Sequence, residues 1–84
     1  MGIKELIGLM KHHISDKIID LSAPGARMDE EQKIAAFWCG RQTATWLIDL
    51  IESAKQEDLI DLDEMTKLTQ EVMDLNRKLS NLRP

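Results

Sequence analysis

Few residues of this chain have the type and spacing that chemistry at a site requires. His12 and His13 are adjacent, so in a helix their side chains diverge by about 100° and cannot chelate one ion together. His12 and Asp16 have the i, i+4 spacing of a ligand pair, but two ligands form no metal site without others. We therefore expect two solvated imidazoles and no bound metal.

The single cysteine, Cys39, cannot form an internal disulfide, and its apolar neighbours predict a buried, unreactive side chain. A nucleophilic pair of Cys39 with a histidine would need two helices to bring them together, and nothing in the spacing requires this. The motifs of phosphate-binding loops, nucleophile elbows and zinc proteases are absent from the sequence. We expect a protein that is not an enzyme and that has no catalytic residues, no cofactor and no small-molecule substrate.

Acidic residues gather in one segment late in the chain: Glu57, Asp58, Asp61, Asp63 and Glu64. A calcium loop of the EF-hand type needs a glycine in its middle, and this segment has none. A helix start fits better, with Asp61 as N-cap, the Glu64 side chain returning the bond, and Ile60 packing on Met65. Residues 56–62 form either a turn or a bend in a continuous helix.

The spacing of apolar residues predicts an all-α single domain (1–84) with helices over about 3–21, 30–56 and 62–82. Pro24 and Gly25 mark a turn, and Asp29 with Gln32 forms a capping-box pattern before the second helix. We expect a helical hairpin of the last two helices with the N-terminal amphipathic helix packed on it. The alternative for the first helix is that it lies on a membrane surface. The third helix is either a bundle helix or a coiled-coil seam.

The central stretch from Ile34 to Ile51 is the most apolar part and holds all three aromatic residues. Gly40 and Ala44 lie four residues apart, which indicates either close helix packing or a kink at Gly40. Trp38 and Trp46 lie broadly along the opposite side, as core residues or as an interface. We assign a partner-binding surface to Ile34, Trp38, Arg41 and Trp46, in which Arg41 can stack on the Trp38 ring.

Composition limits the function further. A chain of 84 residues buries too little surface for high stability alone, so oligomerisation is a common remedy. The net charge of −4 argues against binding to nucleic acid, which attracts basic surfaces. Uninterrupted apolar runs stay too short for a transmembrane helix. We expect a cytoplasmic protein that binds protein, as a homo-oligomer or within a larger assembly, and neither nucleic acid nor membrane.

The central stretch resembles small α-helical proteins encoded near the capsid and portal genes of tailed bacteriophages. The resemblance covers residues 34–80 and is carried by Trp38-Cys39-Gly40, Ala44, Trp46-Leu47 and Leu50-Ile51-Glu52, followed by an acidic turn and a second helix. It implies a component of the virion or of head assembly and no catalytic residue. The alternative is a small acidic regulatory or inhibitory protein that binds a host enzyme.

Overall fold

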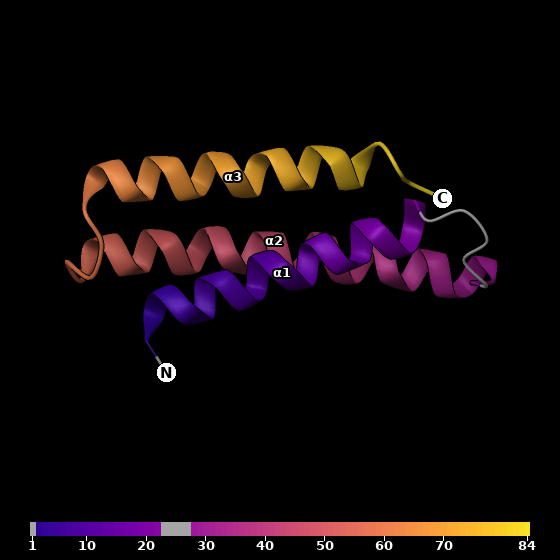
Figure 1. Ribbon diagram of the computed structural model, residues 1–84, viewed down its shortest axis with the longest axis horizontal. Helices are drawn as coiled ribbons and strands as arrows, with labels where there is room; N and C mark the ends of the chain where they lie inside the picture. Colours follow the sequence, from indigo (N-terminus) through magenta and orange to yellow (C-terminus); the bar gives the residue numbers. More distant parts are fainter. Residues whose placement is uncertain (1, 23–27) are drawn as a thin grey trace.

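The computed structural model describes residues 2–22 and 28–84, which form three helices. Helix α1 spans Ile3–Ser22, α2 spans Glu30–Gln56 and α3 spans Leu62–Ser80. Helices α1 and α3 point the same way, and α2 returns antiparallel to both (Figure 1). Helix α2 packs against α1 and α3, and these also contact each other. The all-α prediction, with a hairpin of α2 and α3 and α1 packed on it, is confirmed.

The helix boundaries agree closely with the predicted ones because capping residues set them. At the start of α2, the Gln32 N–H donates to Asp29 Oδ1 (2.8 Å), and the Asp29 N–H donates to Gln32 Oε1 (3.1 Å). This is the complete capping box that the sequence predicted. Helix α3 ends two residues before the predicted boundary, at Ser80. The predicted turn at 24–25 lies outside the described residues.

Residues 57–61 form a turn, which excludes the alternative of a bent continuous helix. The Leu59 N–H donates to the Ala54 carbonyl (2.9 Å), and the Asp58 N–H donates to the Lys55 carbonyl (3.1 Å). These two bonds are the Schellman pattern, which closes a helix through one left-handed residue. Asp58 is that residue, with a φ of 58°. The turn reverses the chain without glycine or proline.

Asp61 begins α3 as predicted, because its side chain accepts from the Glu64 N–H (2.7 Å). The predicted return bond from the Glu64 side chain is wrong. The carboxylate of Glu64 instead pairs with Lys4 Nζ of α1 (3.0 Å). A second ion pair, Lys11 with Glu71, lies further along the same two helices. The Glu64 side chain therefore connects α3 to α1 instead of closing its own helix end.

The core lies where the three helices meet. Its main cluster consists of fully buried aliphatic side chains from all three helices and from the turn: Ile7, Ile14, Ala44, Leu47, Ile51, Ala54, Ile60 and Val72. The apolar side of α1 is thus used for packing on α2 and α3, as expected for a bundle helix. Helix α2 runs through Gly40 without interruption, and Gly40 is buried. Close packing is therefore the role that the structure shows for this glycine.

Candidate functional site

The two tryptophans of α2 point away from the core. Trp38 is 53% exposed and Trp46 is 58% exposed, whereas their neighbours Phe37 and Leu47 are buried. Of the two alternatives for the tryptophans, the core position is therefore excluded. Tryptophan is enriched at protein interfaces, because its large apolar ring and its polar N–H suit a surface that a partner covers.

The exposed side of α2 carries little charge over more than three turns, since the partly exposed Arg41 is the sole charged residue between positions 34 and 46. Every exposed residue from position 34 to position 46 is uncharged: Ile34, Ala35, Trp38, Cys39, Gln42, Thr45 and Trp46. We call these seven residues the uncharged strip. Charged residues make up 31% of the whole chain, so a solvated helix face would normally include several of them. Acidic residues bound the strip, with Glu31 before it and Asp49 after it.

In the first half of the strip, the exposed Trp38 packs against the buried ring of Phe37. The rings of Phe37 and Trp38 meet edge to face, with centroids 5.2 Å apart and an interplanar angle of 76°. The guanidinium carbon of Arg41 lies 5.9 Å from the Trp38 ring centroid and 5.8 Å from that of Phe37. The predicted stacking of Arg41 on Trp38 is confirmed. Because Phe37 is buried, its contact with the exposed Trp38 indole restricts the orientations that the indole can adopt.

A hollow of about 200 Å³ lies next to this aromatic pair, lined by Ile34, Phe37, Trp38, Arg83 and Pro84. Ile34, at 44% exposure, forms part of it. Three of the four predicted partner-binding residues, namely Ile34, Trp38 and Arg41, thus gather at one end of α2. Sequence reasoning missed Arg83 and Pro84, because only the fold brings the end of the chain back to this helix.

Trp46 lies apart from that group. Eight residues separate it from Trp38, which at about 100° and 1.5 Å per residue leaves the two side chains roughly 80° and 12 Å apart. The four predicted residues therefore form an elongated surface along α2 rather than a compact cluster.

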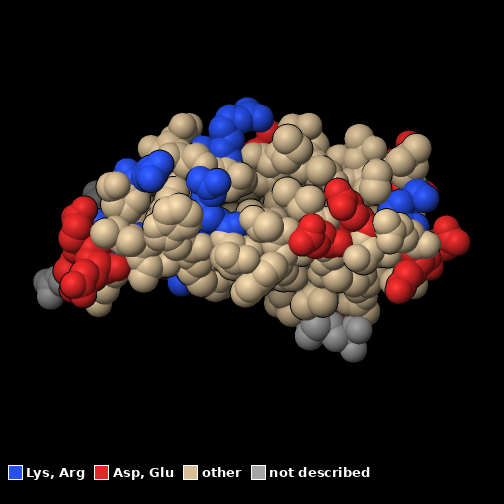
Figure 2. All heavy atoms as spheres, turned by 180° about the vertical axis from the view of Figure 1, so that it is seen from behind, with Lys and Arg blue, Asp and Glu red and all other residues tan. Residues whose placement is uncertain are grey.

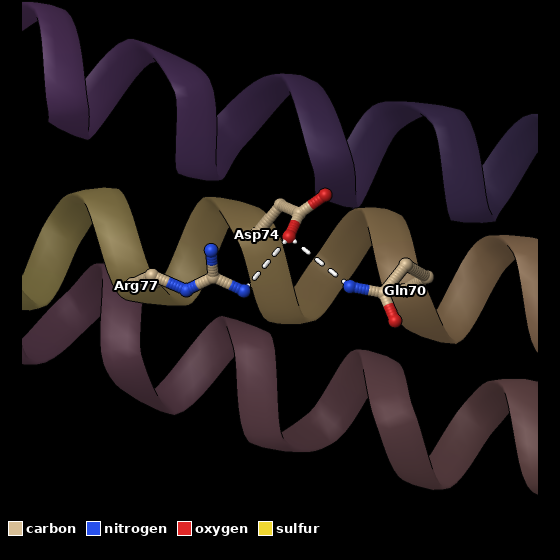
Figure 3. A network of polar contacts seen from close by, with 3 residues as sticks. All are labelled: Gln70, Asp74 and Arg77. Carbon is tan, nitrogen blue, oxygen red and sulfur yellow. Dashed lines mark hydrogen bonds and ion pairs between the residues drawn. The ribbon is translucent and has the colours of Figure 1, made fainter.

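Charge is distributed differently on the neighbouring helix. On α3, Asp74 Oδ1 accepts from Gln70 Nε2 and from Arg77 Nη2, each at 3.1 Å (Figure 3). Figure 2, which views the molecule from behind, shows a surface that is mostly free of charged atoms, with Asp and Glu at both ends and in one further group between them. The polar side chains of this network form hydrogen bonds with one another, so they do not require hydrogen bonds from a partner protein. The uncharged strip of α2 has no comparable network.

Cys39 is exposed, so the prediction of a buried thiol is wrong. Its sulfur lies 3.4 Å from Nε2 of His13, because α1 passes beside this edge of α2. The described residues contain no group of three or more His, Cys, Asp or Glu side chains that could hold a metal ion. His12 pairs with Asp16 within α1 (3.5 Å) and does not take part. The His13–Cys39 contact is one exposed pair without a third orienting group among its hydrogen bonds.

Comparisons with known proteins were made for the whole chain. No protein-family model matches it, and neither the curated proteins nor the solved structures contain a match. Among the described helices, none combines the length and apolar character that a membrane span requires.

Proposed function

We propose that this protein is a non-enzymatic structural or assembly protein that acts through helix-mediated protein–protein contacts of α2. The observation that carries the proposal is the exposure of Trp38 and Trp46, at 53% and 58%, on a helix face whose sole charged residue between positions 34 and 46 is Arg41. Tryptophan and arginine are the residues that most often dominate interface energies. The resemblance of the central stretch to small tailed-phage proteins supports virion or head assembly, in the host cytoplasm or the particle, as the setting.

Covering the exposed side chains of this surface would contribute favourable hydrophobic free energy to association. Covering the exposed half of a tryptophan removes roughly 100 Å² from water, which at about 25 cal/mol per Å² contributes roughly 2.5 kcal/mol per side chain. Two tryptophans with Ile34 therefore offer several kcal/mol before the entropy cost of association is subtracted. The buried Phe37 beneath Trp38 reduces the side-chain ordering that a partner would have to impose.

Replacing Trp46 by alanine tests the proposal, because the side chain contributes little to folding where it stands. We expect W46A to keep the wild-type melting temperature within about 2 °C and to lose association in light scattering at micromolar concentration. F37A is the matched control, since removal of a buried aromatic ring costs about 3–5 kcal/mol of folding stability. A W38A/W46A double variant that still associates and still captures the same partners would contradict the proposal.

A second candidate is a small acidic protein that regulates or inhibits a host enzyme. It is favoured by the net charge of −4 and by the acidic residues that flank both ends of α2. Binding through these charges would weaken steeply with added salt, because ions screen exposed charges. Binding through the uncharged strip would not. Capture of partners from native lysate at about 50 mM and 500 mM salt, with wild type and W46A in parallel, separates the two functions.

A further inference from the structure

The hollow near the start of α2 has the size and the lining of a pocket for one apolar side chain. Its volume is about 200 Å³, and Ile34, Phe37, Trp38 and Pro84 contribute apolar side chains to its lining. A cavity of about 150 Å³ is large enough to bind benzene, so the side chain of a leucine or a phenylalanine fits this one in size. We call this site the Trp38 hollow.

Two arginines border the Trp38 hollow. Arg83 lines it, and the guanidinium carbon of Arg41 lies 5.8 Å from the ring centroid of Phe37 and 5.9 Å from that of Trp38. Among the described residues, neither arginine forms an ion pair with a carboxylate. A guanidinium above an aromatic ring still has N–H groups at its edge, and a carboxylate can accept two of them together.

The charge at this site is opposite to that of the protein as a whole. The chain has 15 acidic and 11 basic residues, yet the two arginines at the hollow have no acidic partner among the described residues. Figure 2 shows most Lys and Arg atoms of its surface on the half that holds the start of α2 and the end of the chain, as comparison with Figure 1 shows. We propose that the Trp38 hollow binds an apolar side chain of a partner protein whose neighbouring residues are acidic and pair with Arg41 and Arg83. This inference rests on the proposed function and assigns a chemistry to the partner at one end of α2.

A protein segment with one or two carboxylates fits this site better than a nucleic acid or a membrane does. Glu30 and Glu31 lie about one helical turn before Ile34, so the positive region is small and has negative charge on one side. Nucleic acids and anionic membranes carry many negative charges over a wide area, and some of these would face the two glutamates. A protein segment can present carboxylates to the arginines and uncharged residues to Glu30 and Glu31.

Nuclear magnetic resonance of the two indole N–H groups tests the proposal, because Trp46 provides a control within the same molecule. The probes are acetyl-Leu-Asp-Glu-amide and acetyl-Asp-Glu-Leu-amide, each titrated to about 5 mM at about 20 mM salt, where screening is weak. We expect the Trp38 resonance to shift with at least one of these peptides, while that of Trp46, roughly 12 Å along α2, stays in place. The same peptides with alanine instead of leucine should bind about tenfold more weakly, because they bury less apolar surface.

Reversal of charge separates a direct role of the arginines from a structural one. R41Q and R83Q should each weaken binding of the acidic peptides about threefold, as expected for exposed ion pairs. R41E/R83E should lose the acidic peptides and instead bind acetyl-Leu-Lys-Lys-amide or acetyl-Lys-Lys-Leu-amide, a switch that a loss of packing would not produce. K33Q is the matched control, because Lys33 is a partly exposed cation of the same helix that does not line the hollow. It should bind the acidic peptides as the wild type does.

The same measurements can contradict this chemistry without contradicting the proposed function. A Trp38 resonance that neither acidic peptide moves would overturn the inference, as would binding of the lysine peptides by the wild type as tightly as the acidic ones. Pelleting of the wild type but not of R41Q/R83Q with phosphatidylglycerol vesicles would assign the arginines to a lipid surface and also overturn it. The capture of partners from lysate with W46A uses none of these peptides, so it judges the proposed function separately.

Discussion

Leu79 of α3 lies directly over Gly40 of α2. A Cβ atom added to Gly40 would stand 2.7 Å from Leu79 Cδ2 and 3.4 Å from the Cβ of Lys17 in α1. Real Cβ atoms almost never make a contact as short as the first of these. The three helices therefore converge at Gly40, and the absence of a side chain there permits α1 and α3 to approach α2 together.

Replacing Gly40 by alanine should destabilise the fold despite the better helix propensity of alanine. The propensity gain is about 1 kcal/mol, whereas overpacking a filled site costs about 1–3 kcal/mol. Leu79 is fully buried, so its methyl group has little room to move aside. We expect a net loss of about 1 kcal/mol for G40A, measured by chemical denaturation.

Gly8 is the matched control, because it lies inside α1 and a Cβ there would meet nothing within 4 Å. G8A should gain up to about 1 kcal/mol from helix propensity alone. The two substitutions are chemically identical, so opposite signs isolate the packing term. Equal gains in both variants would show that Leu79 moves away without cost.

Asp58 holds the left-handed position in the turn between α2 and α3, with a φ of 58°. Glycine is the usual residue at this place in a Schellman motif, because a Cβ makes the left-handed region unfavourable. The carboxylate of Asp58 also lies close to the C-terminal, negative end of α2. D58G should therefore raise the free energy of unfolding by about 0.5–1 kcal/mol. Thermal and urea denaturation would measure the gain.

The neighbouring residue provides the control for that experiment. Glu57 has a φ of −90°, which any residue adopts, so glycine there brings only the entropy cost of a more flexible unfolded chain. E57G should be neutral or destabilising by up to about 1 kcal/mol. If D58G and E57G behave alike, strain at Asp58 is not the cause.

The two ion pairs between α1 and α3 should differ in strength. Lys4 and Glu64 are 67% and 40% exposed, whereas Lys11 and Glu71 are 31% and 35% exposed. Water screens the first pair more, and exposed pairs contribute about 0–1 kcal/mol. Double-mutant cycles with K11M and E71Q should give a coupling of about 0.5–1 kcal/mol, and K4M with E64Q a smaller one. A larger coupling for the Lys4 pair would contradict this order.

The sequence predicted those features of the fold that depend on neighbouring residues. The helix boundaries followed from apolar spacing and from the Asp29–Gln32 capping box, whose bonds lie within one turn. The errors have a different origin. Glu64 was predicted to bond within its own helix, but Lys4, 60 residues earlier, takes its carboxylate. Competition between a local bond and a distant ion pair cannot be judged before the packing of α1 is known.

The sequence predicted which residues form the candidate site, but not how exposed they are or how they are arranged. Helical geometry placed Trp38 and Trp46 opposite the Gly40–Ala44 side, but their exposure depended on whether α1 or α3 would cover them. Both helices pack on the other side, which also leaves Cys39 exposed, at the edge that His13 of α1 approaches. One signal was available: Arg41 is the sole charged residue from position 34 to position 48. A segment of this length with a single charged residue predicts an exposed side of low charge once the core side is assigned.

Asn76 of α3 offers the last test, because its polar group lies beside the core. Its Oδ1 atom is buried and has no hydrogen-bond partner among the described residues. The buried Val72 and Leu79 lie on the same side of α3, four residues before it and three after it. An unsatisfied buried polar atom costs about 1–3 kcal/mol, and an apolar replacement of similar shape removes that cost. N76L should therefore raise the free energy of unfolding by about 1 kcal/mol.

Asn81, which is exposed at the C-terminal end of α3, is the control for the loss of an amide as such. N81L should change stability by less than about 0.5 kcal/mol. N76D separates polarity from size, because it keeps the shape but places a charge beside the core, and it should be less stable than the wild type. Urea denaturation of the three variants measures all of these effects. A loss of stability in N76L would mean that the amide makes a bond that leucine cannot replace, and that Asn76 specifies how α3 packs on its neighbours.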